Sequence, residues 1–532
     1  MAEAAAPSPG APSARAGGLA IAAAIVAFGF LGSRLLGILR TVAIAGAFGS
    51  SPELDSYFVA FRIPDLIFQV LAGATLGSAF IPVFARVYRR DGDERAWALA
   101  STVLNLVTAA TAVLCVLGLI LAPWLVPLLA PGLGDDIGRH AELTDKAVKL
   151  TRIMLLSPLL FAMSGMVTGI LNARQRFMLP ALAPMLYNGA IIVGAVVFAG
   201  PWGVEGLAVA VVAGSGLHLV VQLPGLVRER MRYRLLFNWR DRAAREVGRL
   251  MGPRVVGLAA AQVNFLITTY FASKVGASAI SDLSYAWLIA GLPLALFGMA
   301  LSTAVFPRLA EHVADGDMAS FTATISRVLR VIMFFSIPAA VGLALLRVPA
   351  TTVLLQRGEF TAADTLVTAS ALGFYCLGVV PQAGIEIHSR GFYALGDTRS
   401  PVILAVAAVI LNLALSAVLY ERYEHEGLAF AVSASSWVEW GLLYILYVRR
   451  TGARAGDDLR GIAHMAMCAA TMALFLALAL APLDDAGRTA NVLAGVSGAV
   501  AGAIVYVATA RWLAVEELAE ASQRLRALFA RK

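Results

Sequence analysis

Long apolar stretches recur along almost the whole chain and are separated by polar segments. We count fourteen, centred near residues 30, 72, 112, 160, 190, 214, 262, 295, 337, 378, 410, 438, 471 and 500. A helix of about 20 residues crosses the hydrocarbon core of a bilayer, and it satisfies its backbone hydrogen bonds internally. The pattern therefore predicts an all-α polytopic membrane protein with 14 transmembrane helices.

Two segments of the chain are near-copies. Residues 205–215 read EGLAVAVVAGS and residues 426–436 read EGLAFAVSASS, so eight of eleven positions are identical. The offset that carries Glu205 onto Glu426, called the repeat offset below, also carries Pro180 onto Pro401. A fainter similarity relates the stretch from Gly49 to Asp55 to that from Gly276 to Asp282. The alternative is chance similarity between Ala/Val/Gly-rich helices.

The near-copies predict two parallel six-helix repeats, because an even number of spans inserts both copies in the same orientation. We place an N-lobe at 19–227, a basic cytoplasmic linker at 228–249 and a C-lobe at 250–450. Two extra helices follow at 461–511 without a counterpart in the repeat.

Composition agrees with this class. The chain is 59% hydrophobic and 14% charged, with a mean hydropathy of +0.78, far from the composition of soluble proteins. Its three cysteines lie in apolar stretches without metal-ligand spacing, so we expect neither a disulfide framework nor a metal or other cofactor. No cleavable signal peptide is evident, and residues 1–18 read as a disordered cytoplasmic tail.

The distribution of basic residues predicts the orientation. With a cytoplasmic N-terminus, inside segments carry 29 Lys and Arg, outside segments carry 9 and spans carry 4, which accounts for all 42. This bias follows the positive-inside rule and places both termini in the cytoplasm. The net charge of +8 then reflects topology and calls for no nucleic-acid partner. The linker at 228–249 is more typical of a loop lying on anionic lipid than of a binding site, and 512–532 predicts an amphipathic cytoplasmic helix.

Charged residues inside the first two spans are the main functional candidates. Arg34 and Arg40 lie in the first span, Asp55 and Arg62 lie in the second, and Asp65, also in the second span, is a secondary candidate. An ionised side chain near mid-bilayer costs about 2.5–3.5 kcal/mol on insertion scales, so it is expected to face water or a partner. Arginine presents a fixed fork of donors that suits phosphate, which favours an anionic substrate. The alternative is that these groups lie near span ends, where they snorkel or pair with one another.

The second half of the chain has fewer charges within its spans. Arg254 and Glu386 are secondary candidates, and Glu386 is near His388 and Arg390 in the sequence. A small-cation exporter would need carboxylates where the first spans carry arginines. A membrane glycosyltransferase or phosphatase would need catalytic carboxylates, or His with Arg, on sizeable outer loops, and none shows them. We therefore expect a transporter and not an enzyme.

Several motifs resemble one family closely. They are SRLLGILR at 33–40, AFG at 47–49, DSYFVAFRIPDL at 55–66, SAFIPVF at 78–84 and GFYALGDTRSP at 391–401. They resemble the MurJ (MviN) family of lipid II flippases, in the multidrug/oligosaccharidyl-lipid/polysaccharide exporter superfamily. The resemblance covers nearly the whole chain in order.

The resemblance implies a function and a site. The family pattern implies alternating access of two six-helix lobes in the bacterial inner membrane, with a groove at 461–511 for the lipid tail. Ser33, Arg34, Arg40 and Asp55 fall on family positions implicated in transport, and Arg62 occupies a position that is usually basic. The substrate would be lipid II, carried for cell-wall synthesis by a monomer, with Na+ or H+ and the membrane potential as possible driving forces.

Four departures from the family pattern bear on the substrate. Thr41 replaces a common aspartate, Phe68-Gln69 replaces a basic pair, Gly73-Ala74 replaces Glu-Gly, and Trp287-Leu288 stands where an arginine is expected. That arginine helps to hold the diphosphate in the family. Its loss keeps open a flippase or exporter of another polyprenyl-diphosphate-linked oligosaccharide, and an ion-coupled small-molecule exporter is a further alternative.

Overall fold

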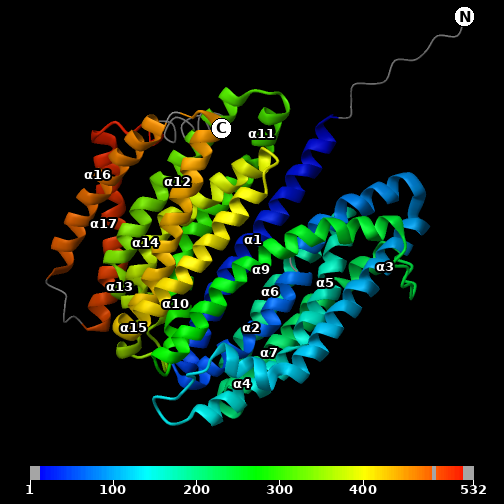
Figure 1. The fold of residues 1–532 in the computed structure, drawn as a ribbon, viewed down its shortest axis with the longest axis horizontal. Coiled ribbons are helices and arrows are strands. Elements are labelled where there is room, and N and C mark those ends of the chain that lie inside the picture. The colour runs from blue at the N-terminus through cyan, green and yellow to red at the C-terminus, as the bar shows by residue number, and fades with distance from the viewer. Residues whose placement is uncertain (1–11, 73, 454, 482–486, 519–532) are drawn as a thin grey trace, which may run out of the picture. The chain divides into compact units, whose positions relative to one another are not determined.

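The computed structural model describes residues 12–72, 74–453, 455–481 and 487–518 (Figure 1). These residues form helices and no strand, which confirms the all-α polytopic class. In chain order the elements, with three short π-helical segments marked η, are α1 (Pro12–Phe48), α2 (Pro52–Ile67), η1 (Phe68–Ala72), α3 (Ala74–Leu129), α4 (His140–Met154), α5 (Leu156–Ala173), α6 (Met178–Val193), η2 (Gly194–Phe198), α7 (Ala199–Val220), α8 (Leu223–Arg228), α9 (Arg242–Val275), α10 (Ala279–Pro293), η3 (Leu294–Met299), α11 (Ala300–Ala314), α12 (Met318–Leu345), α13 (Arg347–Leu355), α14 (Ala362–Ala394), α15 (Arg399–Thr451), α16 (Ala455–Leu480) and α17 (Arg488–Trp512).

All fourteen predicted centres fall within these helical elements. Ten helical stretches of the described chain are long and apolar enough to cross a membrane, and two of them, Met178–Arg228 and Arg399–Thr451, contain two predicted centres each. Three helices are broken by backbone kinks, at Gly92 in α3, Gly203 in α7 and Glu424 in α15. A left-handed φ at each kink ends one helical segment and starts the next.

The chain divides into two compact units. Unit 1 comprises residues 1–47, 56–127 and 141–259, and unit 2 comprises 48–55, 128–140 and 260–532. The short segments 48–55 and 128–140 thus group with unit 2, whereas the sequence placed both in the N-lobe. Helix α1 begins at Pro12, inside the stretch predicted as a tail, and most of the predicted helix at 512–532 lies outside the described residues.

The core of each unit is built from large apolar side chains on facing helices. In unit 1, Phe80, Phe84 and Trp97 of α3 pack with residues of α5 and α9. In unit 2, the core joins α12 and α14 to α16 and α17, and the Tyr506 hydroxyl donates to the carbonyl of Phe334 over 3.0 Å. The two helices predicted at 461–511 therefore pack against the rest of unit 2 (Figure 1).

The repeat offset recurs in the backbone. Helix α5 ends in a left-handed residue, Gln175 (φ 59°), and α14 ends in its counterpart at the same offset, Gly396 (φ 75°). At both ends the N–H of the next residue donates to the carbonyl five positions earlier, over 2.8 Å at Arg176 and 2.9 Å at Asp397. These bonds form the Schellman motif that commonly ends helices. The two copies therefore share helix-end geometry as well as sequence.

The repeat offset also carries one ion pair onto another. Arg176 Nε donates to Glu229 Oε1 over 2.7 Å in unit 1, and Arg450 donates to Asp397 in unit 2. Arg176 corresponds to Asp397 and Glu229 corresponds to Arg450, so the signs of the two pairs are exchanged. The kinks at Gly203 (φ 54°) and Glu424 (φ 44°) are related by the same offset.

Candidate substrate-binding site

Helix α1 packs tightly against α6 through small residues. A Cβ placed on Gly29 would lie 2.5 Å from Cβ of Ala181, and one placed on Gly32 would lie 2.9 Å from Cε of Met185. Close approach of backbones through glycine is common at helix interfaces in membranes. The adjacent residue Ser33 accepts a hydrogen bond at its carbonyl from Asn188 Nδ2, over 3.4 Å.

This packing fixes the position of Arg34. Its side chain is exposed, and its guanidinium carbon lies 5.3 Å from the ring centroid of Phe30, one turn earlier on α1. A cation over an aromatic ring is held by the ring quadrupole, and a guanidinium in that position keeps donors available. Arg34 is thus an exposed cation of α1 whose guanidinium lies over a neighbouring aromatic ring.

Arg40, Arg62 and Asp65 form a second charged group in unit 1. All three side chains are partly buried, and Asp65 interacts electrostatically with both arginines. Tyr187 of α6 is within electrostatic range of the same Arg40. The structure therefore brings together three of the predicted residues, and this group carries one carboxylate for two guanidinium groups. Pro64 and the π-helical segment η1 interrupt regular hydrogen bonding beside it, a feature often found at functional positions.

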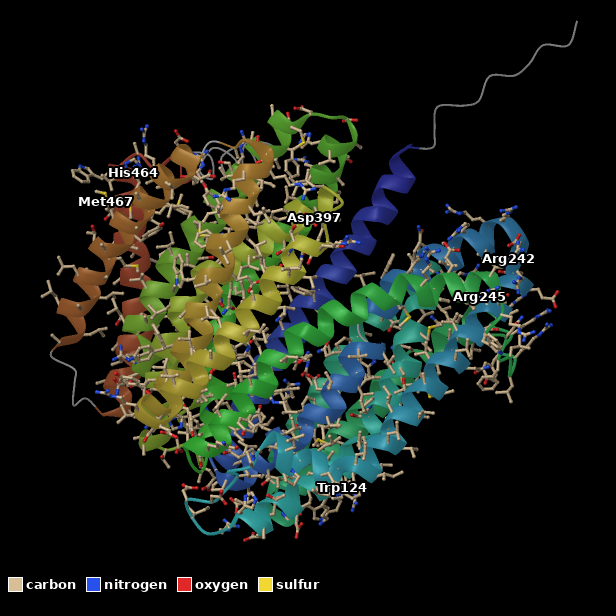
Figure 2. All side chains as sticks on the ribbon, in the orientation of Figure 1. Trp124, Arg242, Arg245, Asp397, His464 and Met467 are labelled. Atoms are coloured by element: carbon tan, nitrogen blue, oxygen red, sulfur yellow. The ribbon has the colours of Figure 1, made fainter. Side chains whose placement is uncertain are left out.

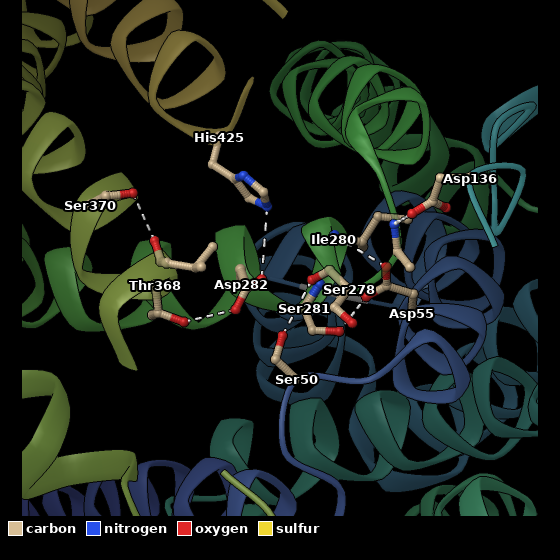
Figure 3. Close-up of polar contacts among 12 residues, drawn as sticks. Ser50, Asp55, Asp136, Ser278, Ile280, Ser281, Asp282, Thr368, Ser370 and His425 are labelled. Atoms are coloured by element: carbon tan, nitrogen blue, oxygen red, sulfur yellow. Dashed lines mark hydrogen bonds and ion pairs between the residues drawn. The ribbon is translucent and has the colours of Figure 1, made fainter. Parts of the chain in front are cut away.

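Asp55 has a different environment, in unit 2. Its side chain is buried and accepts hydrogen bonds from the N–H groups of Ser281, over 2.7 Å, and Ile280, over 3.4 Å, and from the Ser281 hydroxyl (Figure 3). These donors belong to the first turn of α10, whose free N–H groups and helix dipole favour a carboxylate. All three hydrogen bonds described at the Asp55 carboxylate come from α10, so this side chain is placed to hold the start of that helix.

A neighbouring polar group in unit 2 was not predicted. Asp282 is buried, accepts a hydrogen bond from Thr368 Oγ1 over 2.9 Å and lies 3.8 Å from Nε2 of His425 (Figure 3). The sequence offered one signal for it, since Asp282 is the counterpart of Asp55 in the fainter of the two similarities. Thr368 and His425 are distant in sequence and had no such signal.

The secondary candidates have separate environments. Glu386 forms an ion pair with Arg390 over 3.5 Å, one turn along α14. His388 is buried and bonds the carbonyl of Gly384 over 2.8 Å, so these residues share a helix but not one polar cluster. The side chain of Arg254 lies outside the described residues.

Trp287 stands where the family pattern has an arginine. Its ring packs edge-on against Phe265, with centroids 5.7 Å apart, and against Tyr375 at 5.3 Å. The position is therefore part of an aromatic group in unit 2, and it offers no cation to an anionic ligand.

The described helices are long and apolar, the sequence repeats, and the first two helices carry arginines. These features together indicate one class of protein. It is a polytopic membrane transporter. A family model described as "Lipid II flippase MurJ" matches residues 44–491. The chain belongs to the MurJ family of lipid II flippases.

Individual relatives carry the name of the same family. The chain is 34% identical over 427 residues to "Lipid II flippase MurJ" of Burkholderia cenocepacia, covering 79% of this chain and 82% of the relative. It is 30% identical over 503 residues to "Probable lipid II flippase MurJ" of Rhizobium meliloti, covering 90% and 91%.

Solved structures share the fold. A structure described as "Lipid II flippase MurJ, inward closed conformation" matches with a TM-score of 0.76 at 24% identity, covering 92% of this chain and 99% of that one. An inward-facing multidrug resistance MATE family transporter of the MOP superfamily matches with a TM-score of 0.65 at 17% identity, covering 79% and 95%.

Proposed function

We propose that this chain translocates lipid II across the bacterial inner membrane, from the cytoplasmic to the outer leaflet, by alternating access. The observation that carries the proposal is the family match over residues 44–491 in a chain that keeps arginines in α1 and α2. Lipid II joins its sugar to its polyprenyl tail through a diphosphate. A diphosphate that leaves water needs fixed, charged donors, and guanidinium groups supply them with matching geometry.

The residues of unit 1 take distinct roles in this proposal. Arg34, exposed on α1, meets the diphosphate first because its donors are available. Arg40 and Arg62 contribute positive charge, and Asp65 holds both guanidinium groups in place. Ser33 is next to Arg34 on the segment of α1 that α6 fixes. Asp55 acts on transport through α10, which it caps, and not through direct contact with substrate.

The remaining features of the proposal concern topology and energy supply. Both termini lie in the cytoplasm, the chain works as a monomer, and α16 and α17 receive the lipid tail. The driving force is the membrane potential or a gradient of Na+ or H+.

A reconstituted flipping assay tests the arginine mechanism. Loss of one charged hydrogen bond costs about 1.5–3 kcal/mol, so Arg34→Ala is expected to lower flipping roughly tenfold to a hundredfold. Arg34→Lys should recover only part of the activity, because a point charge lacks the bidentate fork. Arg449→Ala is the matched control, since Arg449 is an exposed arginine at the end of α15. Activity of Arg34→Ala equal to that of the control would contradict the mechanism.

A second substrate is favoured by Trp287. With an aromatic side chain in place of a family arginine, the chain loses one donor for the diphosphate, and another polyprenyl-diphosphate glycolipid becomes the alternative. Lipid II and an undecaprenyl-diphosphate lipid with a different glycan are compared in the same vesicles. Transport of the second lipid alone, with loss on Arg34→Ala, would keep the mechanism and replace the substrate.

A further inference from the structure

The segment between α8 and α9 is attached along the side of α3 in unit 1. The N–H of Arg234 donates to Ser101 Oγ over 3.2 Å, and Asn105 Nδ2 donates to the carbonyls of Arg234 (3.2 Å) and Leu236 (3.0 Å). The Tyr233 hydroxyl donates to Asn105 Oδ1 over 2.9 Å. Residues 233–236 thus have a fixed place on α3, and do not form a free loop.

Ion pairs fix the same segment on both sides of these contacts. Arg234 pairs with Glu94 over 2.8 Å, and Asp241 pairs with Arg95. Burial opposes ionisation of Asp241, but the N–H of Ala244 and the Arg95 guanidinium outweigh it and hold the pKa of Asp241 below its usual range. Asp241 is therefore charged at neutral pH, and it caps the start of α9.

These contacts set the depth of the segment relative to the apolar part of α3. Asp93 marks the polar start of the helical segment that follows the kink at Gly92. Ser101 and Asn105 lie further along this segment, and at 1.5 Å of rise per position they are about 12 and 18 Å from Asp93 along the helix. Residues 233–236 therefore lie on the apolar side of the polar start of this helical segment, in the direction of the bilayer.

Large apolar side chains of this segment point away from the protein. Leu235 is 73% exposed, Phe237 is 53% exposed and Trp239 is 63% exposed. Leu236, which lies among these residues, is only partly exposed, so the three exposed side chains at positions 235, 237 and 239 form an apolar row. Aromatic residues concentrate at the boundary between headgroups and hydrocarbon, where an amphipathic ring is stable. A row of this kind in water would expose apolar surface without compensation.

Exposed arginines flank the apolar row. Arg232, Arg240 and Arg242 are exposed, and within the described residues none of them forms an ion pair with a carboxylate. The guanidinium carbon of Arg240 lies 5.0 Å from the ring centroid of Trp239. Arg242 and Arg245 mark the start of α9 in Figure 2, where their side chains extend outward from the helix.

We propose that residues 231–242 are an interfacial anchor that binds the headgroups of anionic phospholipids in the leaflet at that end of unit 1. The apolar row enters the boundary region, and the three arginines receive phosphate groups beside it. Each basic residue near an anionic surface strengthens binding roughly fivefold. The contacts to Ser101 and Asn105 hold the anchor rigid, so little conformational entropy is lost when lipid binds. This site is separate from α1 and α2, and it requires no particular transport substrate.

Lipid selectivity of the full-length protein tests the proposal. The relative association constant of spin-labelled phosphatidylglycerol over phosphatidylcholine is measured by electron paramagnetic resonance in reconstituted vesicles. The triple variant Arg232→Gln, Arg240→Gln, Arg242→Gln is expected to lose about tenfold in affinity for the bound phosphatidylglycerol, which is less than the sum of three separate surface charges. The control Arg308→Gln, Arg449→Gln, Arg460→Gln removes the same charge from exposed positions of unit 2 and should lose less than about twofold.

Two outcomes would overturn the anchor. Equal losses in the two triple variants would mean that selectivity follows net charge alone. A loss of affinity for a polyprenyl-diphosphate lipid with unchanged phosphatidylglycerol binding would assign the arginines to the transport substrate. Thermal unfolding of both variants is followed in parallel, and a variant that unfolds at lower temperature is replaced by its Arg→Lys equivalent, which should retain most of the selectivity.

Depth of insertion is an independent test that leaves the arginines unchanged. The three native cysteines are buried, so Leu235→Cys accepts a nitroxide label selectively. Relaxation by oxygen should exceed relaxation by a water-soluble nickel complex at this position, as it does for labels below the headgroups. A label at Glu246 of α9, which is paired with Arg86, serves as the control and should show the opposite ratio. Nickel-dominated relaxation at 235 would overturn the proposal.

Discussion

Two helix ends in this protein have the same backbone and opposite charges. The end of α5 is held by Arg176 and Glu229, and the end of α14 by Asp397 and Arg450. The geometry of the two Schellman motifs agrees bond by bond, yet the charges of this ion pair are exchanged. Duplication therefore preserved an ion pair at this position and left its direction free.

A second comparison shows the opposite tendency. Across the fainter similarity, the offset that relates Asp55 to Asp282 carries Arg40 onto Ile267 and Arg62 onto Ile289. Here the two arginine positions of the first copy are apolar in the second, although Asp55 keeps a charged counterpart in Asp282. The ion pairs at the helix ends were therefore kept in both copies, whereas the arginines at positions 40 and 62 occur in the first copy alone.

The largest expected effect comes from making the first copy like the second. The double variant Arg40→Ile, Arg62→Ile removes both guanidinium groups beside Asp65 and leaves that carboxylate without them. We expect flipping in reconstituted vesicles to fall at least about a hundredfold, from two charged interactions of roughly 1.5–3 kcal/mol each. The matched control, Ile267→Val with Ile289→Val, should change flipping less than about twofold. Retained activity in the double arginine variant would show that the charge difference between the copies is incidental.

The next effect concerns the reversed ion pairs. Both carboxylates are largely buried, but Glu229 is contacted by Arg174, which is itself largely buried, in addition to Arg176, whereas the ion pair described at Asp397 is with Arg450. Glu229→Gln should therefore lower the free energy of unfolding by about 1–3 kcal/mol, and Asp397→Asn by about 1 kcal/mol. The double exchange Asp397→Arg with Arg450→Asp should recover part of the loss seen in Asp397→Arg alone. Denaturation in detergent measures each value, and no recovery in the exchange would mean that the sign is fixed by its surroundings.

A smaller effect is expected at the two kinks. Both have a left-handed φ, but Gly203 lacks a Cβ and Glu424 carries one. An L-residue in this region costs roughly 1 kcal/mol relative to glycine. Glu424→Gly should therefore raise the unfolding midpoint slightly, whereas Gly203→Ala should lower it. A lower midpoint for Glu424→Gly in thermal unfolding would indicate that the Glu424 side chain itself stabilises the kink.

The smallest effect is the dependence of the helix ends on pH. The Ser400 hydroxyl and N–H hold the pKa of Asp397 below its usual range, and Arg450 contributes. Burial opposes ionisation of Glu229, but Arg176 and Arg174 outweigh it and lower the pKa of Glu229 as well. Both carboxylates bind fewer protons in the folded chain than in the unfolded chain. Their contribution to stability is therefore complete above the ordinary pKa values, 3.8 for Asp397 and 4.5 for Glu229. It is lost as the pH falls through the lowered pKa values of the folded chain. Unfolding between pH 6 and 3 should show this loss in the native chain and less of it in Glu229→Gln.

The sequence predicted the spans well because bilayer thickness imposes a length and a composition on every crossing helix. It also predicted which arginines would be inside the first helices. It did not predict the partners of Asp55 or of Asp282, because helix N-termini and hydroxyls such as that of Thr368 leave no periodic signal. The contact of residues 233–236 with α3 was missed for the same reason, since it joins positions far apart in the sequence through single hydrogen bonds.

The exchanged charges at the two helix ends also bear on assembly during membrane insertion. A helix end of one copy placed by mistake on the partner segment of the other would bring Arg176 against Arg450, or Asp397 against Glu229. Such like-charge encounters are repulsive, whereas two copies with the same sign at each position would accept either partner. The reversal therefore disfavours pairing of a helix end with the segment from the other copy. During membrane insertion, each of the two helix ends is stable only against the partner segment of its own half.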